Sequence, residues 1–266
     1  MTRPIVAHIS TQALQHNLRV VRQYAPESRI AAVIKASAYG HGTLRVARAL
    51  HDADAFALLN TEAAAQLRHA GLAHPIVMLE GMFAASEIDD YIALHLIPVL
   101  HQPEQLQWLL QAELPRPFDV WVKLNTGMNR LGLEACELDR ALGLLADRAD
   151  VTLMTHFADA DGRHGIGAQL ARFHDMRGDR SLPVSLANSA ALLRYPLASD
   201  AAVPRLRGPL LLLHGAEDGL IPPSHSRALA ALAAQARLVV VPGAGHNDLH
   251  QFEPYLDALR QALAAL

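Results

Sequence analysis

Short runs of apolar residues alternate with segments of helical periodicity along most of the chain. The apolar runs predict strands at residues 30–34, 55–59, 76–79, 97–100, 120–124, 151–155 and 184–186. Helical patterns follow them at 43–51, 61–70, 86–94, 103–111, 138–146 and 168–176. Strands that are apolar on both faces and are each followed by a helix are typical of a parallel sheet. Seven strands in this order favour an α/β barrel, because a closed barrel of eight strands needs only one more.

The composition fits a folded protein with a packed core. Of the 266 residues, 51% are hydrophobic and 18% are charged, so a packed core is easily supplied. The net charge of −3 favours neither a nucleic acid nor a membrane as partner. The N-terminus lacks the apolar stretch of a signal peptide, and the strongly apolar run 209–213 is too short to span a bilayer. Cys136 is the single cysteine and no HExxH occurs, so we expect a cytoplasmic protein without a metal site.

Lys35 stands where the first predicted strand ends, which is the position of active-site residues in α/β barrels. Burial lowers the pKa of a lysine and frees its amine to attack a carbonyl. Gly40 and Gly42 follow, and glycines let backbone N–H groups approach an anion. On these grounds alone, an ordinary lysine at the end of a strand, with its ammonium group in water, is the favoured interpretation.

The sequence around Lys35 is more specific. Residues 32–42, AVIKASAYGHG, resemble the cofactor-attachment motif of the alanine racemases, with Ser37 where the family usually has asparagine. Four further segments resemble the same family in the same order: 79–83 (LEGMF), 122–132 (VKLNTGMNRLG), 154–161 (MTHFADAD) and 185–190 (SLANSA). The resemblance covers residues 1–197. It implies a barrel of the fold-type-III class that uses pyridoxal 5'-phosphate, and a racemase that interconverts L-alanine and D-alanine.

The resemblance also implies roles for individual residues. Lys35 would hold the cofactor covalently and act as the base on one face of the substrate. Tyr39 and Ser189 would contact the cofactor phosphate, and Arg130 would lie beside the phenolic oxygen of the ring. His156 and Asn188 would line the site. The family is dimeric, so a homodimer is an expected partner besides the amino-acid substrate.

The tail differs from the rest of the chain. After a connection at 197–207, residues 211–223 (LLLHGAEDGLIPP) and 240–246 (VVPGAGH) resemble the segments that carry the acid and the histidine of α/β-hydrolases. Asp218 and His246 would take these two roles. No Gly-x-Ser-x-Gly nucleophile turn occurs in the chain, so the pair is expected to be vestigial. We therefore expect two parts, the barrel at 1–197 and a hydrolase-like tail at 198–266, joined as in a chimera.

The tail also affects the expected activity. An alanine racemase would continue after residue 197 with an eighth strand and then a β-rich domain that carries a catalytic tyrosine. Without these we expect impaired racemisation, since one positioned acid–base group typically contributes about 10²–10⁴-fold in rate. We expect residues 210–213 to take the place of the eighth strand, between 30–34 and 184–186. The competing arrangement is an open seven-stranded sheet with the hydrolase-like fragment as a separate small lobe. The alternatives are a serine hydrolase and a fusion protein that binds pyridoxal phosphate without catalysis.

Overall fold

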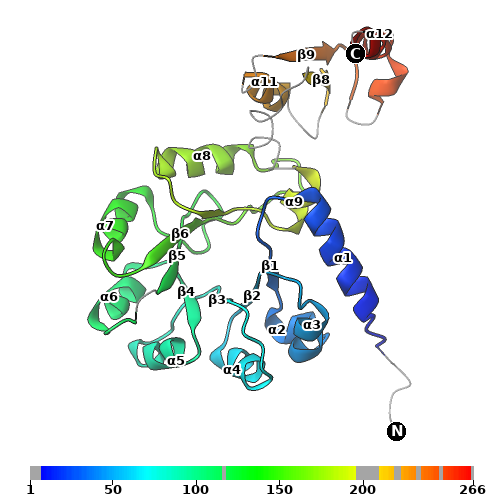
Figure 1. Ribbon diagram of the computed structural model, residues 1–266. Coiled ribbons are helices and arrows are strands. Elements are labelled where there is room, and N and C mark those ends of the chain that lie inside the picture. The colour runs from blue at the N-terminus through cyan, green and yellow to red at the C-terminus, as the bar shows by residue number, and fades with distance from the viewer. Residues whose placement is uncertain are drawn as a thin grey trace. The chain divides into compact units, whose positions relative to one another are not determined.

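The structure is a computed structural model that describes residues 7–115, 118–195, 210–218, 223–231, 235–245 and 248–264. The chain divides into two compact units (Figure 1). The first unit contains Met1–Ala158 and Ala168–Asn188, and the second contains Asp159–Gly167 and Ser189–Leu266. Each unit is described by itself below.

The first unit holds seven strands. They are β1 (Ala31–Val33), β2 (Ala55–Leu58), β3 (Ile76–Met78), β4 (Leu96–Leu100), β5 (Asp119–Lys123), β6 (Asp150–Met154) and β7 (Val184–Ser185). They form one sheet in the order of the sequence, and every neighbouring pair is parallel. The seven strands predicted from the apolar runs are thus confirmed, and so is the α/β class.

Helices surround this sheet (Figure 1). They are α1 (Thr11–Tyr24), α2 (Lys35–Tyr39), α3 (Thr43–Ala49), α4 (Thr61–His69), the 3₁₀ turn η1 (Ala85–Glu87), α5 (Ile88–Ala93), α6 (Pro103–Gln111), α7 (Ala135–Leu145) and α8 (Gly167–Arg177). Side chains cap the starts of two of these helices, α1 and α7. The Ser10 hydroxyl accepts from the backbone N–H of Ala13 at the start of α1, and Glu134 and Glu137 form a capping box at α7.

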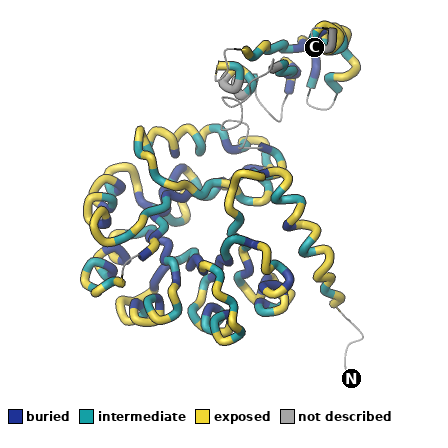
Figure 2. The backbone as a smooth tube through the Cα atoms, viewed as in Figure 1, coloured by how far each residue is buried: buried dark blue, intermediate teal, exposed yellow. Residues whose placement is uncertain are grey.

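The two faces of the sheet bury different residues. Phe56 and Leu58 of β2 lie in the large core between the strands and the helices. Ala57, between them, packs on the other face with Val77, Val99 and Met154. This alternation follows from the two-residue period of a strand. Burial on both faces explains why the strands are near-continuous apolar runs, and Figure 2 shows the exposed residues gathered on the helices.

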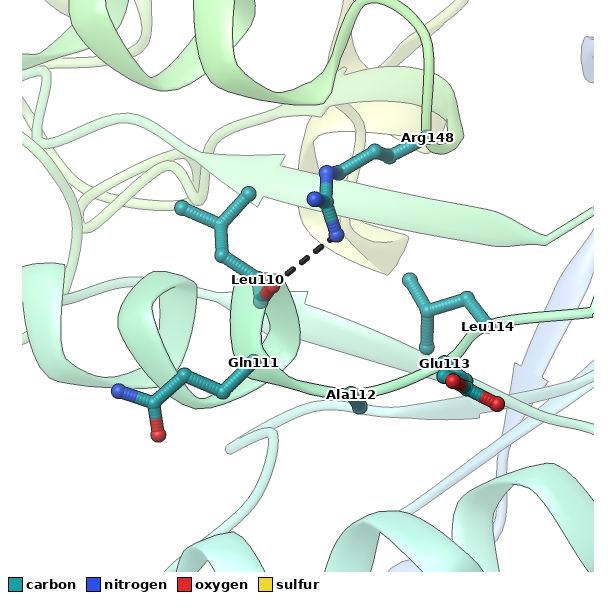
Figure 3. Close-up of a pocket in the computed structure, with 6 residues that line it drawn as sticks. All are labelled: Leu110, Gln111, Ala112, Glu113, Leu114 and Arg148. Atoms are coloured by element: carbon teal, nitrogen blue, oxygen red, sulfur yellow. Dashed lines mark hydrogen bonds between the residues drawn. The ribbon is translucent and has the colours of Figure 1, made fainter.

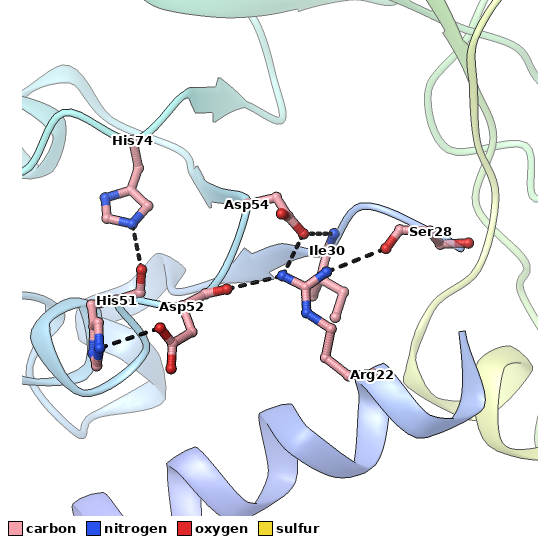
Figure 4. Close-up of polar contacts among 7 residues, drawn as sticks. All are labelled: Arg22, Ser28, Ile30, His51, Asp52, Asp54 and His74. Atoms are coloured by element: carbon pink, nitrogen blue, oxygen red, sulfur yellow. Dashed lines mark hydrogen bonds and ion pairs between the residues drawn. The ribbon is translucent and has the colours of Figure 1, made fainter. Parts of the chain in front are cut away.

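The amino-terminal ends of β1 and β2 are held by charged contacts with α1 (Figure 4). The Arg22 guanidinium lies 2.8 Å from an Asp54 carboxylate oxygen and donates to the Asp52 carbonyl at 2.9 Å. The same Asp54 oxygen accepts from the backbone N–H of Ile30 at 2.6 Å. These contacts stabilise the amino-terminal edge of the sheet, whereas in α/β barrels the chemistry takes place at the opposite, carboxyl edge of the strands.

The strand β8 (Leu210–Gly215) does not complete this sheet in the part of the chain that the structure describes. It pairs in parallel with β9 (Ala236–Val241), from Leu210 opposite Ala236 to Gly215 opposite Val241. The prediction that residues 210–213 pair with β1 and β7 is therefore wrong. The physical reason is that β8, α11 (Pro223–Ala231) and β9 form a βαβ unit, which supplies a partner strand within the tail.

The two edge strands of the seven-stranded sheet, β1 and β7, also have no paired neighbour on their outer sides among the described residues. Val33 of β1 is 43% exposed and Val184 of β7 is 40% exposed. The fold is thus an open barrel of seven parallel strands over the described residues, and the predicted (β/α)8 closure is not observed.

The second unit also contains α9 (Ser189–Arg194), the 3₁₀ turn η3 (Leu249–Gln251) and α12 (Glu253–Ala264). The predicted boundary between residues 197 and 198 lies outside the described residues and stays a prediction. Among the helices that the structure describes, none is long and apolar enough to cross a membrane.

Candidate active site

Polar residues gather where the strands of the first unit end. Lys35 follows β1, Glu80 follows β3, His101 follows β4, Lys123 ends β5, and His156 follows β6. Because all these strands are parallel, their carboxyl ends lie at one edge of the sheet. We call Lys35, Glu80, His101, Lys123, Arg130 and His156 the strand-end cluster. Their charges interact, as the pKa shifts below show.

Lys123 is the most deeply buried cation of the cluster, with 6% of its surface exposed. Burial lowers the pKa of its ammonium group, and the positive charges of Arg130 and Lys35 lower it further, against the opposing charge of Glu80. The sequence analysis assigned no role to Lys123. Lys123 could have been predicted as a site residue in the same way as Lys35, because both stand at the end of a predicted strand.

The surroundings of the two histidines of the cluster favour the neutral imidazole, because they lower the pKa of both rings. Burial lowers the pKa of His156, and the positive charges of Lys123, Arg130 and Lys35 lower it further. Burial also lowers the pKa of His101. The His101 Nε2 donates to the Glu80 carbonyl at 2.9 Å, because a carbonyl oxygen can only accept, so the Nε2 nitrogen carries the hydrogen.

Lys35 begins an unusual turn. Ala36, Ser37, Ala38 and Tyr39 have φ between 51° and 55°, which makes α2 a left-handed turn of residues that all carry a Cβ. A left-handed residue with a Cβ costs about 1–2 kcal/mol. The sequence did not predict this turn, since only Gly40 (φ 85°) and Gly42 (φ 91°) favour this region. Tyr39 ends the turn and is 61% exposed.

Arg130 is carried by a loop that Asn125 organises. The Asn125 side-chain oxygen accepts from the backbone N–H groups of Gly127 and Asn129, and its Nδ2 donates to Glu134 at 2.7 Å. The loop closes at Gly132, whose φ is 133°. A Cβ there would lie 2.6 Å from the Asn125 nitrogen, so only glycine fits.

A buried chain of hydrogen bonds joins the ends of β5 and β6. The Thr155 hydroxyl donates to the Leu124 carbonyl at 3.1 Å, so the Thr126 hydroxyl must be the donor in its 2.6 Å bond to Thr155. The Gln169 Nε2 donates both to the Thr126 hydroxyl and to the His156 carbonyl, at 3.2 and 3.1 Å. This chain fixes the backbone beside His156 and beside the Arg130 loop.

The remaining predicted residues lie in different places. The Asn188 side chain donates to the Phe157 carbonyl at 3.0 Å, in the first unit. Ser189 is exposed at the start of α9 and belongs to the second unit. The structure therefore brings together Lys35, Arg130 and His156 through their charges. The contacts of Tyr39 and Ser189 with a phosphate stay predictions.

The tail residues form a separate arrangement in the second unit. Asp218 is 9% exposed and its carboxylate lies 3.6 Å from the Nε2 of His214, while the His214 Nδ1 lies 2.7 Å from the Ser226 hydroxyl. His246 lies outside the described residues. The sequence analysis did not predict the contact between His214 and Ser226, which come from β8 and α11.

A surface pocket elsewhere in the first unit is unrelated to the cluster. It is lined by residues 110–114 and Arg148, whose guanidinium donates to the Leu110 carbonyl at 3.0 Å (Figure 3). These residues precede β5 and β6, so the pocket lies at the amino-terminal edge of the sheet, opposite the strand-end cluster.

The lysine count sharpens the assignment. The chain contains two lysines, Lys35 and Lys123, and both belong to the cluster. The fold and the site thus define an open α/β barrel with a lysine-centred, cationic site at the carboxyl ends of its strands.

Comparisons with known proteins agree. Residues 9–205 match the family "Alanine racemase, N-terminal domain", and the chain belongs to this family. An alanine racemase from Nitrosospira multiformis is 43% identical over 259 residues, which are 93% of this chain and 70% of the relative. One from Laribacter hongkongensis is 44% identical over 220 residues, 81% of this chain and 60% of the relative. The chain thus spans between about 60% and 70% of the length of these relatives.

Solved structures show the same fold. The biosynthetic alanine racemase from Pseudomonas aeruginosa has a TM-score of 0.70 at 39% identity, over 73% of this chain and 56% of that one. An alanine racemase from Bartonella henselae with covalently bound pyridoxal phosphate has a TM-score of 0.61 at 27% identity, over 69% of this chain and 56% of that one. The Nitrosospira match extends into the tail, and these comparisons give no support to its hydrolase resemblance.

Proposed function

We propose that this chain binds pyridoxal 5'-phosphate through Lys35 and interconverts L-alanine and D-alanine. The observation that carries the proposal is the strand-end cluster, in which Lys35, Lys123 and Arg130 place positive charge around the end of β1. Glu80 is the one acidic side chain whose charge contributes to the pKa shifts of Lys123 and His101. Such surplus positive charge suits an anionic cofactor that carries a phosphate and a phenolic oxygen.

The cofactor, when bound, supplies an electron sink for the negative charge that deprotonation leaves on the substrate Cα. Lys35 Nζ would hold the cofactor aldehyde carbon and then move the Cα proton on one face. The Arg130 guanidinium would bind the phenolic oxygen, because Arg keeps its charge at every physiological pH. His156, whose pKa is lowered by burial and by the neighbouring cations, would line the ring with Asn188.

The phosphate contacts rest on the family resemblance. The Tyr39 hydroxyl, at the exposed end of the left-handed turn, and the Ser189 hydroxyl are proposed for this role. The partner is an amino acid, and a homodimer is proposed from the family. The cytoplasmic location and the lowered racemase activity expected from the sequence stay predictions.

Reductive trapping tests the proposal. The chain is incubated with pyridoxal phosphate, reduced with borohydride and digested, and its two lysine peptides are compared by mass spectrometry. We expect the pyridoxyl label on the Lys35 peptide and its loss in Lys35→Arg. In Lys123→Met, which keeps Lys35 as the one lysine of the chain, the label should still be found on Lys35, with binding weakened by the loss of one cation. A label on Lys123, or none in the unmodified chain, would overturn the proposal.

Measuring the conversion of L-alanine to D-alanine distinguishes a racemase from a protein that binds pyridoxal phosphate without catalysis. D-alanine formed from L-alanine by the protein loaded with pyridoxal phosphate and not reduced, and not by Lys35→Arg treated in the same way, supports a racemase. Cofactor binding without any turnover would instead support the alternative of a non-catalytic pyridoxal-phosphate protein. For the tail we propose no hydrolytic role, because Ser226 lies on helix α11 and not on a strand-to-helix nucleophile turn.

A further inference from the structure

The left-handed turn that follows Lys35 needs a source of stability. Four consecutive residues with a Cβ adopt positive φ, and a strained conformation of this kind persists only where the surroundings fix it. Ala38 is the one residue among these four with a buried side chain, at 5% exposure. Packing therefore anchors a single point of the turn, and hydrogen bonds must hold the rest.

Backbone hydrogen bonds close the turn at its two ends. The N–H groups of Gly40 and Gly42 donate to the carbonyls of Ala36 and Ser37, at 3.1 and 2.8 Å. The carbonyls of Ala38 and Tyr39 both face one side chain, and the Ala38 carbonyl also accepts from the backbone N–H of His41 at 3.1 Å. The His41 Nδ1 lies 2.9 Å from the Ala38 oxygen and 3.2 Å from the Tyr39 oxygen. Both acceptors are carbonyls, so the Nδ1 nitrogen carries the hydrogen and shares it between them.

We propose that His41 is a positioning residue, whose Nδ1–H clamps the left-handed turn and so fixes Lys35 and Tyr39 relative to each other. The reason lies in the geometry. Lys35 begins the turn and Tyr39 ends it, and the largely exposed Tyr39 ring has little packing to direct it. The direction of the Tyr39 side chain therefore depends on its backbone, and its own carbonyl is one of the two that His41 holds. The consequence for pyridoxal phosphate rests on the proposed function, whereas the clamp itself does not.

Three substitutions at one position test the clamp. In His41→Asn the side-chain Nδ2 stands near the place of the imidazole Nδ1 and keeps the donor. His41→Gln moves the amide one carbon further out, and His41→Leu removes the donor at similar size. His69→Leu is the matched control, because His69 is an exposed histidine at the end of α4.

The first measurement needs no cofactor. Hydrogen exchange at the Gly40 and Gly42 amides reports how often the turn opens. We expect exchange about tenfold faster in His41→Leu and His41→Gln, as for the loss of one hydrogen bond, and a change below about threefold in His41→Asn and His69→Leu. Unchanged exchange in His41→Leu, or equal acceleration in His41→Asn, would overturn the clamp. An unchanged melting temperature confirms that the variants fold.

The second measurement adds pyridoxal phosphate. Titration followed by absorbance should give a Kd about tenfold weaker for His41→Leu and His41→Gln, with His41→Asn restored to within about threefold of the unmodified chain. If the exchange results hold and the unmodified chain binds no cofactor, the proposed function fails and the clamp stands. If exchange responds but the Kd does not, the turn is clamped without positioning the cofactor groups, and the positioning role is refuted.

Discussion

Replacing Thr155 by valine removes one hydroxyl from the buried chain that joins β5 to β6. The change leaves the Leu124 carbonyl without this donor and the Thr126 hydroxyl without its acceptor. A buried polar group that loses its partner costs about 1–3 kcal/mol, so we expect the free energy of unfolding to fall by about 2–4 kcal/mol. Valine and threonine have nearly the same shape, so a cavity contributes little.

The same reasoning predicts an asymmetry. In Thr126→Val the Thr155 hydroxyl keeps the Leu124 carbonyl and the Gln169 amide keeps the His156 carbonyl, so we expect a loss of only about 1 kcal/mol. The double variant no longer buries an unpaired Thr126 hydroxyl. Its loss should therefore be smaller than the sum of the two single losses by about 1–2 kcal/mol.

Urea denaturation followed by tryptophan fluorescence measures these effects. Both tryptophans of the chain, Trp108 and Trp121, lie in the first unit, so the signal reports the unfolding of that unit. Thr11→Val, at an exposed threonine that begins α1, is the control and should change stability by less than about 0.5 kcal/mol. Equal losses for the two single variants, or strict additivity in the double variant, would refute the direction assigned to the hydrogen bonds.

Four further predictions concern the site and the tail. Lys123→Met should raise the pKa of His156, measured by NMR titration, because a neighbouring cation disfavours the imidazolium form; an unchanged pKa would contradict the charge coupling. The pKa of His156 is lowered in the folded state, so the unfolded chain binds the proton more readily. The free energy of unfolding should therefore decrease as the pH falls below about 6.5, the ordinary pKa of histidine. In His156→Gln this decrease should be smaller, as urea denaturation at several pH values would measure. Gly132→Ala should destabilise the first unit by about 2–4 kcal/mol, because the added Cβ would contact the backbone of Asn125 and Leu124. Gly143→Ala in α7, where a Cβ meets nothing within 4 Å, should instead stabilise the unit by about 0.5–1 kcal/mol. Urea denaturation measures both changes, and an unchanged stability in Gly132→Ala would contradict the close approach of the backbone at Gly132. A fluorophosphonate probe should leave the chain unlabelled, and labelling of Ser226 that disappears in His214→Ala would show that the tail carries an activated serine after all.

The sequence predicted the seven strands because burial on both faces leaves a plain signal, a short apolar run followed by a helical pattern. It also placed Lys35 at the end of β1, because the position of a residue on a strand follows directly from that pattern. The left-handed turn was not predictable, since Ala36 and Ser37 have no intrinsic preference for positive φ. That conformation is imposed by Gly40, Gly42 and His41, through contacts that a pattern does not show.

The tail strand had two possible pairing partners, and strand propensity alone does not decide between them. Residues 210–213 could pair with the open edges of the barrel or with the next apolar run, 236–241. The second pairing wins over the described residues, because the two runs are joined by one short helix and match in register along six residues each. Closing the loop to β1 would instead span most of the chain, and the entropy of loop closure grows with that length.

The distribution of the basic residues gives the last argument for the site. Lysine and arginine together number 23, of which two are lysines, so arginine supplies the positive charge almost everywhere. Arginine cannot lose its proton in a protein, whereas a lysine amine can lose it when burial and neighbouring cations disfavour the charged form. Both lysines stand at the carboxyl edge, and the more buried one, Lys123, has its pKa lowered by burial and by Arg130. Replacing Lys123 by arginine therefore keeps the charge and removes an amine whose charged form is disfavoured. Replacing Lys35 by arginine keeps the charge and removes the amine that can attack an aldehyde. We expect Lys35→Arg to abolish cofactor trapping, because the chemistry at β1 needs the amine and the charge alone does not supply it.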